Sequence, residues 1–300
     1  MAGETMMRAE LRILNFILSR TIKRNFLNGI NIKRLRRSDL SFDSCRSGKN
    51  LLLERISAAG VDVLKIAPES KDISKVIIYL HGGAYVSGPA GNHISFLRRL
   101  SLASASEILL VRYALAPEKN CMKAHSDVQA VYDFALAEYP GKEIILAGDS
   151  AGGGLALAFT MALRDSGGLL PSKLVLLSPW LDASLSNSKI SPEADRADPI
   201  LGRSGLLEAG RMFADNLPLD NFLVSPFYGD PDGLPPMLIL SSNIDILVHD
   251  CRDFYRRCRD SGLEIIYSEY SDIFHAWIVM PPSVQEVKQA FSEVARYISA

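Results

Sequence analysis

Residues 144–154 read Ile-Ile-Leu-Ala-Gly-Asp-Ser-Ala-Gly-Gly-Gly, and the order of residue types in this stretch decides the fold. An apolar run typical of a buried strand leads into a Gly-x-Ser-x-Gly turn and then into small residues that favour a helix. A strand, a sharp turn and a helix in this order make a nucleophile elbow, which presents a serine on a strained turn. The pattern therefore predicts that Ser150 is a nucleophile.

The glycines on either side of this serine have a physical reason. A strained turn brings backbone segments so close together that side chains do not fit, and Gly148 and Gly152 leave the space free. The helix predicted over 151–164 points its first N–H groups and its positive end at the serine. On its own the motif is weak evidence, because an ordinary strand-loop-helix turn explains it about equally well.

Composition limits the class of protein. The chain has 300 residues, of which 48% are hydrophobic and 22% charged, as in globular proteins that bury a large core. Its formal net charge of −1 gives no electrostatic reason to expect nucleic acid as a partner. The four cysteines form no CxxC or Cys/His cluster, and the N-terminus lacks a signal peptide. We therefore expect reduced thiols and a cytoplasmic location.

The first forty residues are the most basic part of the chain. Their longest uncharged apolar piece, residues 13–19, is far shorter than the roughly 20 residues needed to span a bilayer. Apolar residues recur at helical spacing at Leu11, Leu14, Ile17, Leu18 and Ile22. The spacing predicts an amphipathic helix, which either packs on the protein or rests on anionic lipid. Packing on the protein is favoured, because most such helices in soluble proteins cover a core.

Strands and helices alternate in the rest of the chain, which predicts parallel strands joined by right-handed crossovers. Residues 75–80 form a continuous apolar run, suited to burial on both faces of a parallel sheet. Further strands are expected at 60–66, 107–113, 143–147, 174–177, 237–240 and 263–270, and further helices at 93–104, 125–138, 249–261 and 284–298. Between 185 and 222 only a helix over 204–216 is predicted. An insertion of this kind, beyond a strand end, is where α/β folds place a lid.

A serine hydroxyl is a poor nucleophile unless a base takes its proton, and the base in turn needs an acid to orient it. Two later strand ends supply the candidates, because Asp245 follows strand 237–240 and His275 follows strand 263–270. The order Ser, Asp, His matches elbow-type hydrolases. Asp245 also suits a cap of the next helix, and Asp250 is a rival acid. Asp245 is favoured because it lies nearer the strand end.

The negatively charged tetrahedral intermediate of such a reaction needs hydrogen-bond donors. The buried strand 75–80 is followed by His81-Gly82-Gly83-Ala84, an early glycine pair on the loop that supplies such amides. We predict Gly82, Gly83 and Ala151 as the donors and interpret His81 as a brace of the loop. Solvated or capping roles are the simplest interpretation of the remaining histidines, which lie near predicted helix starts: His93, His125 and His249.

Together these motifs resemble the hormone-sensitive-lipase-like family of α/β-hydrolases, in its bacterial branch with a GDSAG elbow. The resemblance rests on HGGA at 81–84, RYALAPE at 112–118, GDSAGGG at 148–154, SPW at 178–180, DPIL at 198–201, SPFYGDPDGLPP at 225–236, the acid loop at 245–250 and HAW at 275–277. It implies an α/β-hydrolase fold with an eight-stranded, mostly parallel sheet flanked by helices, and a helical cap. Ala84 departs from the family's third glycine, and HAW departs from its HGF.

The resemblance also implies a division of the chain and an activity. Residues 1–50 are expected to be an N-terminal basic helical part of the cap, 185–222 the cap insertion, and 51–184 with 223–300 the catalytic core. The activity implied is hydrolysis of carboxylic esters or lactones through an acyl-enzyme, with no metal or organic cofactor. Amide, peptide or acyl-transfer chemistry with the same triad, and a receptor on this scaffold, are the alternatives.

A small-molecule ester or lactone is the expected partner, with short to medium acyl groups because the predicted lid is compact. Large apolar residues near the lid and the strand ends suggest an acyl site, although such residues are as often core: Trp180, Met212, Phe213, Phe222 and Trp277. Weak contact of the basic N-terminus with a membrane surface and a homodimer are left open.

Overall fold

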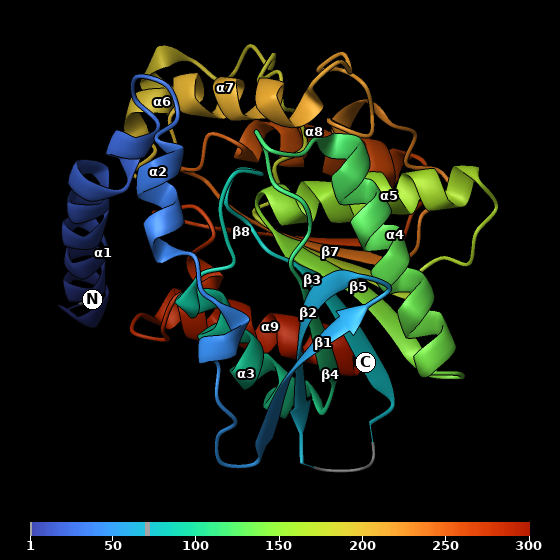
Figure 1. Cartoon of the computed structure of the whole chain (residues 1–300). Helices are drawn as coiled ribbons and strands as arrows, with labels where there is room; N and C mark the ends of the chain where they lie inside the picture. The colour runs from blue at the N-terminus through green and yellow to red at the C-terminus, as the bar shows by residue number, and fades with distance from the viewer. Residues whose placement is uncertain (1, 70–72) are drawn as a thin grey trace.

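A computed structural model describes residues 2–69 and 73–300, and the side chains of 10–69 and 73–300. Residue 1 of the predicted N-terminal segment and residues 70–72 of the predicted core lie outside the described residues. Eight strands form one sheet in the order β1-β2-β4-β3-β5-β6-β7-β8 (Figure 1). The pairs β1–β2 and β2–β4 are antiparallel, and every other pair is parallel. The prediction of an eight-stranded, mostly parallel α/β-hydrolase sheet is confirmed.

The predicted strands and helices are all present, with ends that move by a few residues. The strands are β1 (Leu51–Ala58), β2 (Val61–Pro68), β3 (Lys75–Leu80), β4 (Glu107–Val111), β5 (Glu143–Asp149), β6 (Lys173–Leu177), β7 (Met237–Ser242) and β8 (Ile265–Tyr270). The α-helices are α1 (Ala2–Thr21), α2 (Ile32–Leu35), α3 (Gly91–Ser104), α4 (Cys121–Glu138), α5 (Ala151–Asp165), α6 (Pro192–Ala197), α7 (Arg203–Ala214), α8 (Val248–Asp260) and α9 (Gln285–Ser299).

Strand β3 shows why this sheet needs helices on both faces. Side chains alternate along a strand, so an unbroken apolar run sends apolar groups to both sides. Val76, Ile78 and Leu80 join the core cluster that contains residues of α4, α5 and α8. Ile77 and Tyr79 join the cluster that contains residues of α3 and α9. Figure 1 shows these two groups of helices on opposite sides of the sheet.

Strand β1 is not predicted from the sequence, and its position explains why. It lies at the edge of the sheet and pairs only with β2, in register from Leu51 opposite Pro68 to Ala58 opposite Val61. Leu52 is 54% exposed in this strand. Because neither face is consistently covered, the sequence has no period of two from which a strand could be predicted.

The N-terminal segment and the insertion between β6 and β7 pack against each other; we call residues 2–50 and 185–222 the cap. The Lys23 ammonium donates to the backbone oxygens of Asp195 and Asp198, the latter at 2.6 Å. The Gly205 N–H donates to the Phe26 oxygen at 2.9 Å. Figure 1 shows α6 and α7 running from the side of α1 and α2 across the top of the molecule. Two parts of the chain distant in sequence thus form one layer.

Helix α1 faces the protein with only one side. Leu11 and Leu18 are buried in the core cluster of α3 and α9, as expected of an amphipathic helix that packs on the protein. Its other side carries Ile13, Phe16 and Ile17, which are exposed. Among the described helices, α1 included, none combines the length and the apolar character needed to cross a bilayer.

The contact between the two parts of the cap can be tested with one added methyl group. A Cβ at Gly205 would lie 2.6 Å from the Phe26 Cα, so Gly205→Ala must push the N-terminal segment away. Overpacking of this kind costs about 1–3 kcal/mol of unfolding free energy, more than the roughly 1 kcal/mol that alanine gains in a helix. We expect a lower melting temperature and faster proteolysis of residues 2–50.

Gly91→Ala is the matched control. Gly91 also lies in a helix, but nothing lies within 4 Å of a Cβ built there. This variant should be as stable as the unmodified protein or slightly more stable. Equal stability of the Gly205→Ala variant would contradict a tight contact.

Candidate active site

Ser150 lies at the sharp turn between β5 and α5. Its backbone has φ 52° and ψ −121°, a conformation that L-residues rarely adopt and that costs energy. A Cβ at Gly152 would lie 2.0 Å from the Leu80 oxygen, and one at Gly148 would lie 2.5 Å from the Gly152 carbonyl carbon. Both flanking glycines are therefore needed for the close approach of β3, the turn and α5.

The structure brings Ser150, His275 and Asp245 together in one chain of hydrogen bonds. The distance from Ser150 Oγ to His275 Nε2 is 2.8 Å, and that from His275 Nδ1 to Asp245 Oδ2 is 2.6 Å. All three side chains are buried. Because a carboxylate only accepts, His275 Nδ1 carries the hydrogen, which leaves Nε2 free to accept the serine proton.

The surroundings of His275 favour its charged form. Burial by itself lowers the pKa of the imidazole, but the negative charge and the hydrogen bond of Asp245 act against it. Asp198 and Asp149 add further negative charge, so the pKa of His275 is raised above its usual value. A base of this kind holds the proton it takes from the serine more readily than a free imidazole does.

Asp245 does not cap the next helix, because its Oδ1 accepts from the Leu247 N–H at 2.9 Å, within the loop before α8, and the start of α8 has no side-chain cap. The rival acid, Asp250, lies in another environment. It accepts from the side-chain amide of Asn187 at 2.9 Å, and burial raises its pKa to about 7. Asp245, and not Asp250, is therefore the acid bonded to the histidine.

Asp198 is a buried acid beside the site whose role the sequence does not reveal. Its Oδ2 accepts from the N–H of Ile246, next in the chain to Asp245, at 3.0 Å. Its Oδ1 accepts from the N–H groups of Ile200 and Leu201 at 2.7 and 2.8 Å. Burial raises its pKa first, and the neighbouring charge of Asp245 raises it further. The cap insertion thus holds the loop that carries the acid.

Asp149, one residue before the serine, fixes the loop after β3. Its carboxylate accepts from the Tyr79 hydroxyl at 2.8 Å and from the Gly82 N–H at 3.0 Å, and it lies 3.3 Å from His93 Nε2. Burial alone would raise the pKa of Asp149, but His93, Tyr79 and Gly82 outweigh it, and the pKa is lowered. The carboxylate is therefore ionised and joins the elbow to the glycine loop.

The hydrogen bond from the Gly82 N–H to Asp149 bears on one of the three predicted oxyanion donors. The Gly82 N–H is already bonded to the carboxylate, so the prediction for Gly82 does not hold in this structure. Gly82 has a different reason to be glycine, because a Cβ would lie 2.3 Å from Asp149 Oδ2. The N–H groups of Gly83 and Ala84 have no acceptor among the described residues. Ala151 begins α5 directly after the serine, as predicted.

Among the described residues, no histidine other than His275 is hydrogen-bonded to Ser150. His81 is buried, stacks on Tyr113 and has Nδ1 2.8 Å from the Gly82 oxygen, as a brace of the loop should. His93 accepts the Ala90 N–H at the start of α3, a capping role, but it also reaches Asp149. His125 is neither solvated nor a cap, because it is buried and bonds the Leu223 oxygen at 2.9 Å.

A cavity of about 380 Å³ opens beside Ser150 and His275. The glycine loop, from Gly82 to Ala84, forms part of its wall. The rest of the wall is mostly apolar and comes from the cap and from the segment around His275: Leu18, Ile22, Phe26, Leu35, Ile200, Leu201, Leu206, Phe274, Val279 and Met280. A molecule bound there would contact the serine hydroxyl and a largely apolar surface.

The acyl-site residues suggested from the sequence are not among those that line this cavity. Trp180, Phe213 and Trp277 are buried in the core, and Phe213 stacks on Tyr85 with ring centroids 3.7 Å apart. Met212 and Phe222 pack against the same core from its margin. The cavity uses residues of the N-terminal segment instead.

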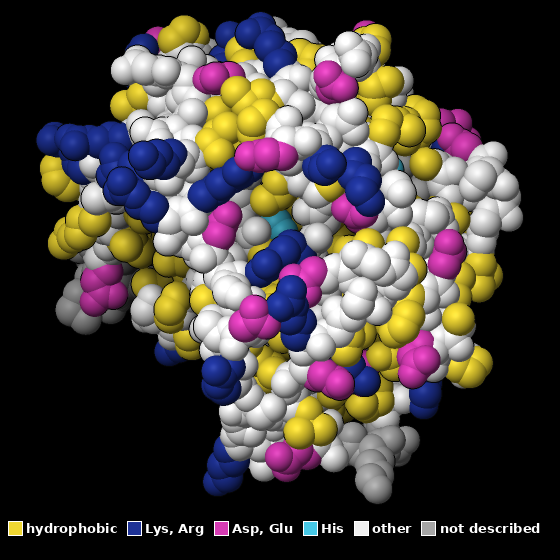
Figure 2. All heavy atoms as spheres, in the orientation of Figure 1, with side chains coloured by type: hydrophobic (Ala, Val, Ile, Leu, Met, Phe, Trp, Pro, Cys, Tyr) yellow, Lys and Arg dark blue, Asp and Glu magenta, His cyan; other side chains and the backbone are white. Residues whose placement is uncertain are grey.

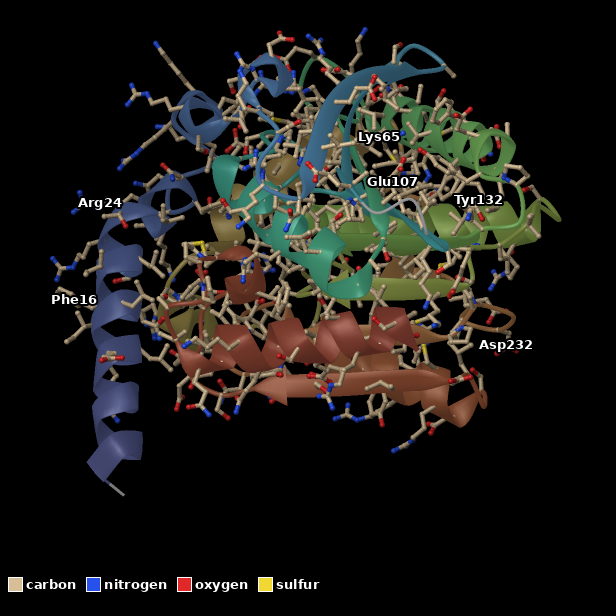
Figure 3. The ribbon with its side chains drawn as sticks, turned by 90° about the horizontal axis from the view of Figure 1, so that it is seen from below. Phe16, Arg24, Lys65, Glu107, Tyr132 and Asp232 are labelled. Carbon is tan, nitrogen blue, oxygen red and sulfur yellow. The ribbon has the colours of Figure 1, made fainter. Side chains whose placement is uncertain are left out.

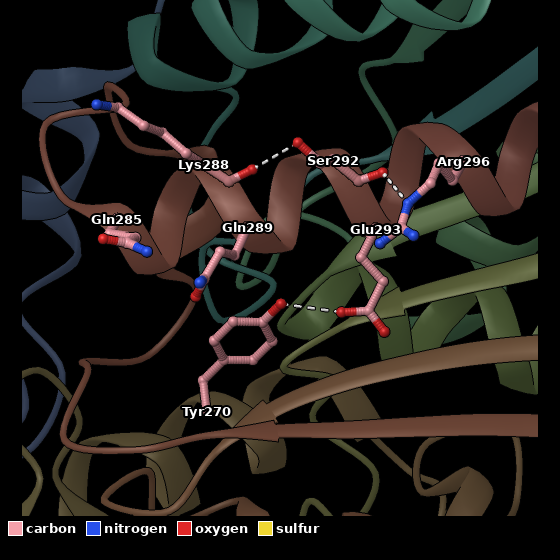
Figure 4. Close-up of a pocket in the computed structure, with 7 residues that line it drawn as sticks. All are labelled: Tyr270, Gln285, Lys288, Gln289, Ser292, Glu293 and Arg296. Carbon is pink, nitrogen blue, oxygen red and sulfur yellow. Dashed lines mark hydrogen bonds between the residues drawn. The ribbon is translucent and has the colours of Figure 1, made fainter.

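A second hollow lies between β8 and α9 and has a different character (Figure 4). It measures about 510 Å³ and is lined by polar groups such as Lys288 and Arg296. The Tyr270 hydroxyl donates to Glu293 Oε2 at 2.9 Å across it. It contains none of the predicted site residues, so we place the chemistry in the cavity beside Ser150.

Comparison with known proteins identifies the family. Residues 77–279 match the sequence model of a family described as alpha/beta hydrolase fold. The chain is 31% identical over 250 residues to a putative acetyl-hydrolase, LipR, of Mycobacterium tuberculosis, covering 83% of this chain and 80% of that protein. It is 29% identical over 248 residues to an esterase of Acinetobacter venetianus, with 82% and 81% covered.

Solved structures agree. An esterase from the bacterial hormone-sensitive lipase family superposes with a TM-score of 0.86 at 28% identity, over 97% of both chains. EstE5, soaked with p-nitrophenyl butyrate, gives 0.86 at 27% identity, also over 97% of both. These findings confirm the resemblance, while the GDSAG branch stays a prediction. The chain therefore belongs to the α/β-hydrolase fold family and is a hormone-sensitive-lipase-like member of it.

Proposed function

We propose that this protein is a serine carboxylesterase that hydrolyses esters or lactones with short to medium acyl groups. The observation that carries the proposal is the hydrogen-bonded chain from Ser150 through His275 to Asp245, which ends in a mostly apolar cavity. The relatives named esterase and acetyl-hydrolase support an ester substrate.

In the first step His275 Nε2 takes the hydroxyl proton of Ser150 while Oγ attacks the ester carbonyl carbon. The positive charge that forms on the imidazole faces the Asp245 carboxylate. The proton then passes to the alcohol oxygen, and the C–O bond of the ester breaks. The alcohol leaves, and the acyl group stays on Ser150 as an ester.

The negative oxygen of the tetrahedral intermediate needs donors in place before the reaction. We assign this role to the N–H groups of Gly83, Ala84 and Ala151, with Gly82 holding the loop through Asp149. Water then hydrolyses the acyl-enzyme: His275 Nε2 takes a proton from water while the water oxygen attacks the carbonyl carbon. The bond from that carbon to Ser150 Oγ breaks, His275 returns the proton to Oγ, and the carboxylic acid leaves. No metal or organic cofactor takes part in either step.

The size and lining of the cavity support short to medium acyl groups. About 380 Å³ lies near the lower end of the range of small-molecule sites. A structure similar to this chain, EstE5, was soaked with p-nitrophenyl butyrate, a short-chain ester. Amide hydrolysis or acyl transfer would use the same triad, and a receptor would not need it.

Covalent labelling separates an enzyme from a receptor. A fluorophosphonate should attach to Ser150, and Ser150→Ala should abolish the label because no other hydroxyl is bonded to His275 among the described residues. His275→Gln should slow labelling by about 1,000-fold or more, since the base is lost. Ser87→Ala is the matched control: Ser87 also lines the cavity but is not bonded to a histidine, and labelling should be unchanged. Absence of labelling in the unmodified protein would exclude the proposed enzymatic function.

The pH dependence follows from the environment of His275. The base must be neutral to act, so kcat/KM should fall as pH drops through a pKa above the ordinary value of about 6.5. Asp198→Asn removes a negative charge that favours the imidazolium, so the acid limb should move to lower pH. Asp250→Asn, which removes a buried acid that does not bond His275, should leave the limb in place. An unmoved limb in the Asp198→Asn variant would contradict this electrostatic role.

A panel of p-nitrophenyl esters tests the substrate size. We expect kcat/KM to be highest from acetate to hexanoate and to fall for long chains. Ile22 lines the cavity yet is 39% exposed, so Ile22→Ala should widen the cavity without destabilising the fold. The ratio of kcat/KM for the octanoate ester to that for the butyrate ester should rise severalfold. Leu27→Ala is the control, because Leu27 is 48% exposed and lies outside the wall. Highest activity of the unmodified protein on long-chain lipids would overturn the proposed size range.

A further inference from the structure

The outer face of α1 carries large apolar side chains that the described protein does not cover. Ile13 is 62% exposed, Phe16 59% and Ile17 49%. Residues spaced by three and four positions share one face of a helix, so these three form a continuous patch. In Figure 3, Phe16 and Arg24 point away from the body of the molecule. Contiguous apolar surface of this kind marks an interaction site more often than chance exposure does.

The same part of the chain is strongly cationic. Residues 11–38 contain eight Lys and Arg and no Asp or Glu, although the whole chain has a net charge of −1. The remaining residues therefore hold 25 basic and 34 acidic groups, a net charge of −9. The positive charge of this protein is concentrated where the apolar patch lies, while the rest of the molecule is acidic.

Most of these cations have no ion-pair partner among the residues that the structure describes. Lys23 is used within the cap, and Arg36 pairs with Glu118 at 2.6 Å. The others are exposed and form no ion pair within the described residues: Arg12, Arg20, Arg24, Lys33, Arg34 and Arg37. Figure 2 shows Lys and Arg side chains gathered beside hydrophobic ones at the edge of the molecule where Figure 1 places α1 and α2.

We propose that this face binds the surface of an anionic phospholipid membrane, with α1 lying in the plane of the interface. Ile13, Phe16 and Ile17 would enter the boundary between headgroups and acyl chains, and Arg12, Arg20 and Arg24 would contact phosphates. Lipid fits better than a second copy of the chain. A two-fold contact through this face would set its cations against each other, whereas anionic headgroups neutralise them.

Membrane binding through α1 brings the cavity close to the lipid. Leu18 and Ile22, from the same segment, line the cavity beside Ser150. An ester dissolved in the bilayer would therefore have a short path to the serine. This last step rests on the proposed function, but binding itself does not require hydrolysis.

Vesicle sedimentation of the full-length protein tests the proposal. We expect it to sediment with vesicles of phosphatidylcholine and phosphatidylserine, and not with phosphatidylcholine alone. Changing Arg12, Arg20 and Arg24 together to Gln should weaken the partition coefficient by about 100-fold, and added salt should do the same progressively. Changing Ile13, Phe16 and Ile17 together to Ser should weaken it at least about tenfold.

Matched controls use exposed residues on other elements. Arg256→Gln with Arg259→Gln removes two exposed charges of α8, and Leu169→Ser removes an apolar side chain that is 69% exposed. Both variants should bind vesicles like the unmodified protein. All variants should hydrolyse a soluble short-chain ester normally, so loss of activity and loss of membrane binding are separate results.

Three results would overturn the proposal. Equal binding to vesicles with and without phosphatidylserine would show that the cations do not contribute to binding. Absence of binding to anionic vesicles would show that this face does not bind membranes. A dimer that light scattering detects and the triple Ser variant abolishes, in the absence of vesicle binding, would assign the face to a second copy of the chain.

Discussion

The carboxylate of Asp149 is the group on which the geometry of the site depends. A buried charge is costly unless donors surround it, and this one is met by the Tyr79 hydroxyl, the Gly82 N–H and His93. These partners belong to β3, to the loop after it and to α3. Because Asp149 directly precedes Ser150, one side chain sets the position of the glycine loop relative to the Ser150 hydroxyl. The N–H groups of Gly83 and Ala84, which we propose as oxyanion donors, are thus placed before any substrate binds.

Features with a local physical cause can be predicted from this sequence. Continuous apolar residues predict strand 75–80 with its observed ends, and the two glycines around Ser150 predict the elbow because a Cβ at either would collide with backbone. Asp245 and His275 could also be predicted from the sequence, but for a different reason. Parallel strands end at the same edge of a sheet, so residues just after β7 and β8 meet beside the end of β5.

Features that depend on contacts between distant segments could not be predicted. Nothing near Gly82 in the sequence shows that its N–H is bonded to Asp149, and nothing near Asp198 shows that it reaches Ile246. The cavity wall illustrates the same limit. Aromatic side chains such as Phe213 are apolar enough for an acyl site, but tertiary packing places them in the core. The edge strand β1 lacks the alternation from which a strand is predicted, because neither of its faces is consistently covered.

The way the cavity is assembled has a consequence for how the protein is made. Leu18 and Ile22 of its wall are synthesised long before Val279 and Met280 of the same wall, because translation runs from the N-terminal to the C-terminal side. A nascent chain therefore carries a basic, apolar helix long before the surface that covers its inner face exists. Leu11 and Leu18 therefore lack their native contacts with α9 until that helix has been synthesised. The cavity wall and the hydrogen bond between Ser150 and His275 can form only after residues 275–280 have been synthesised.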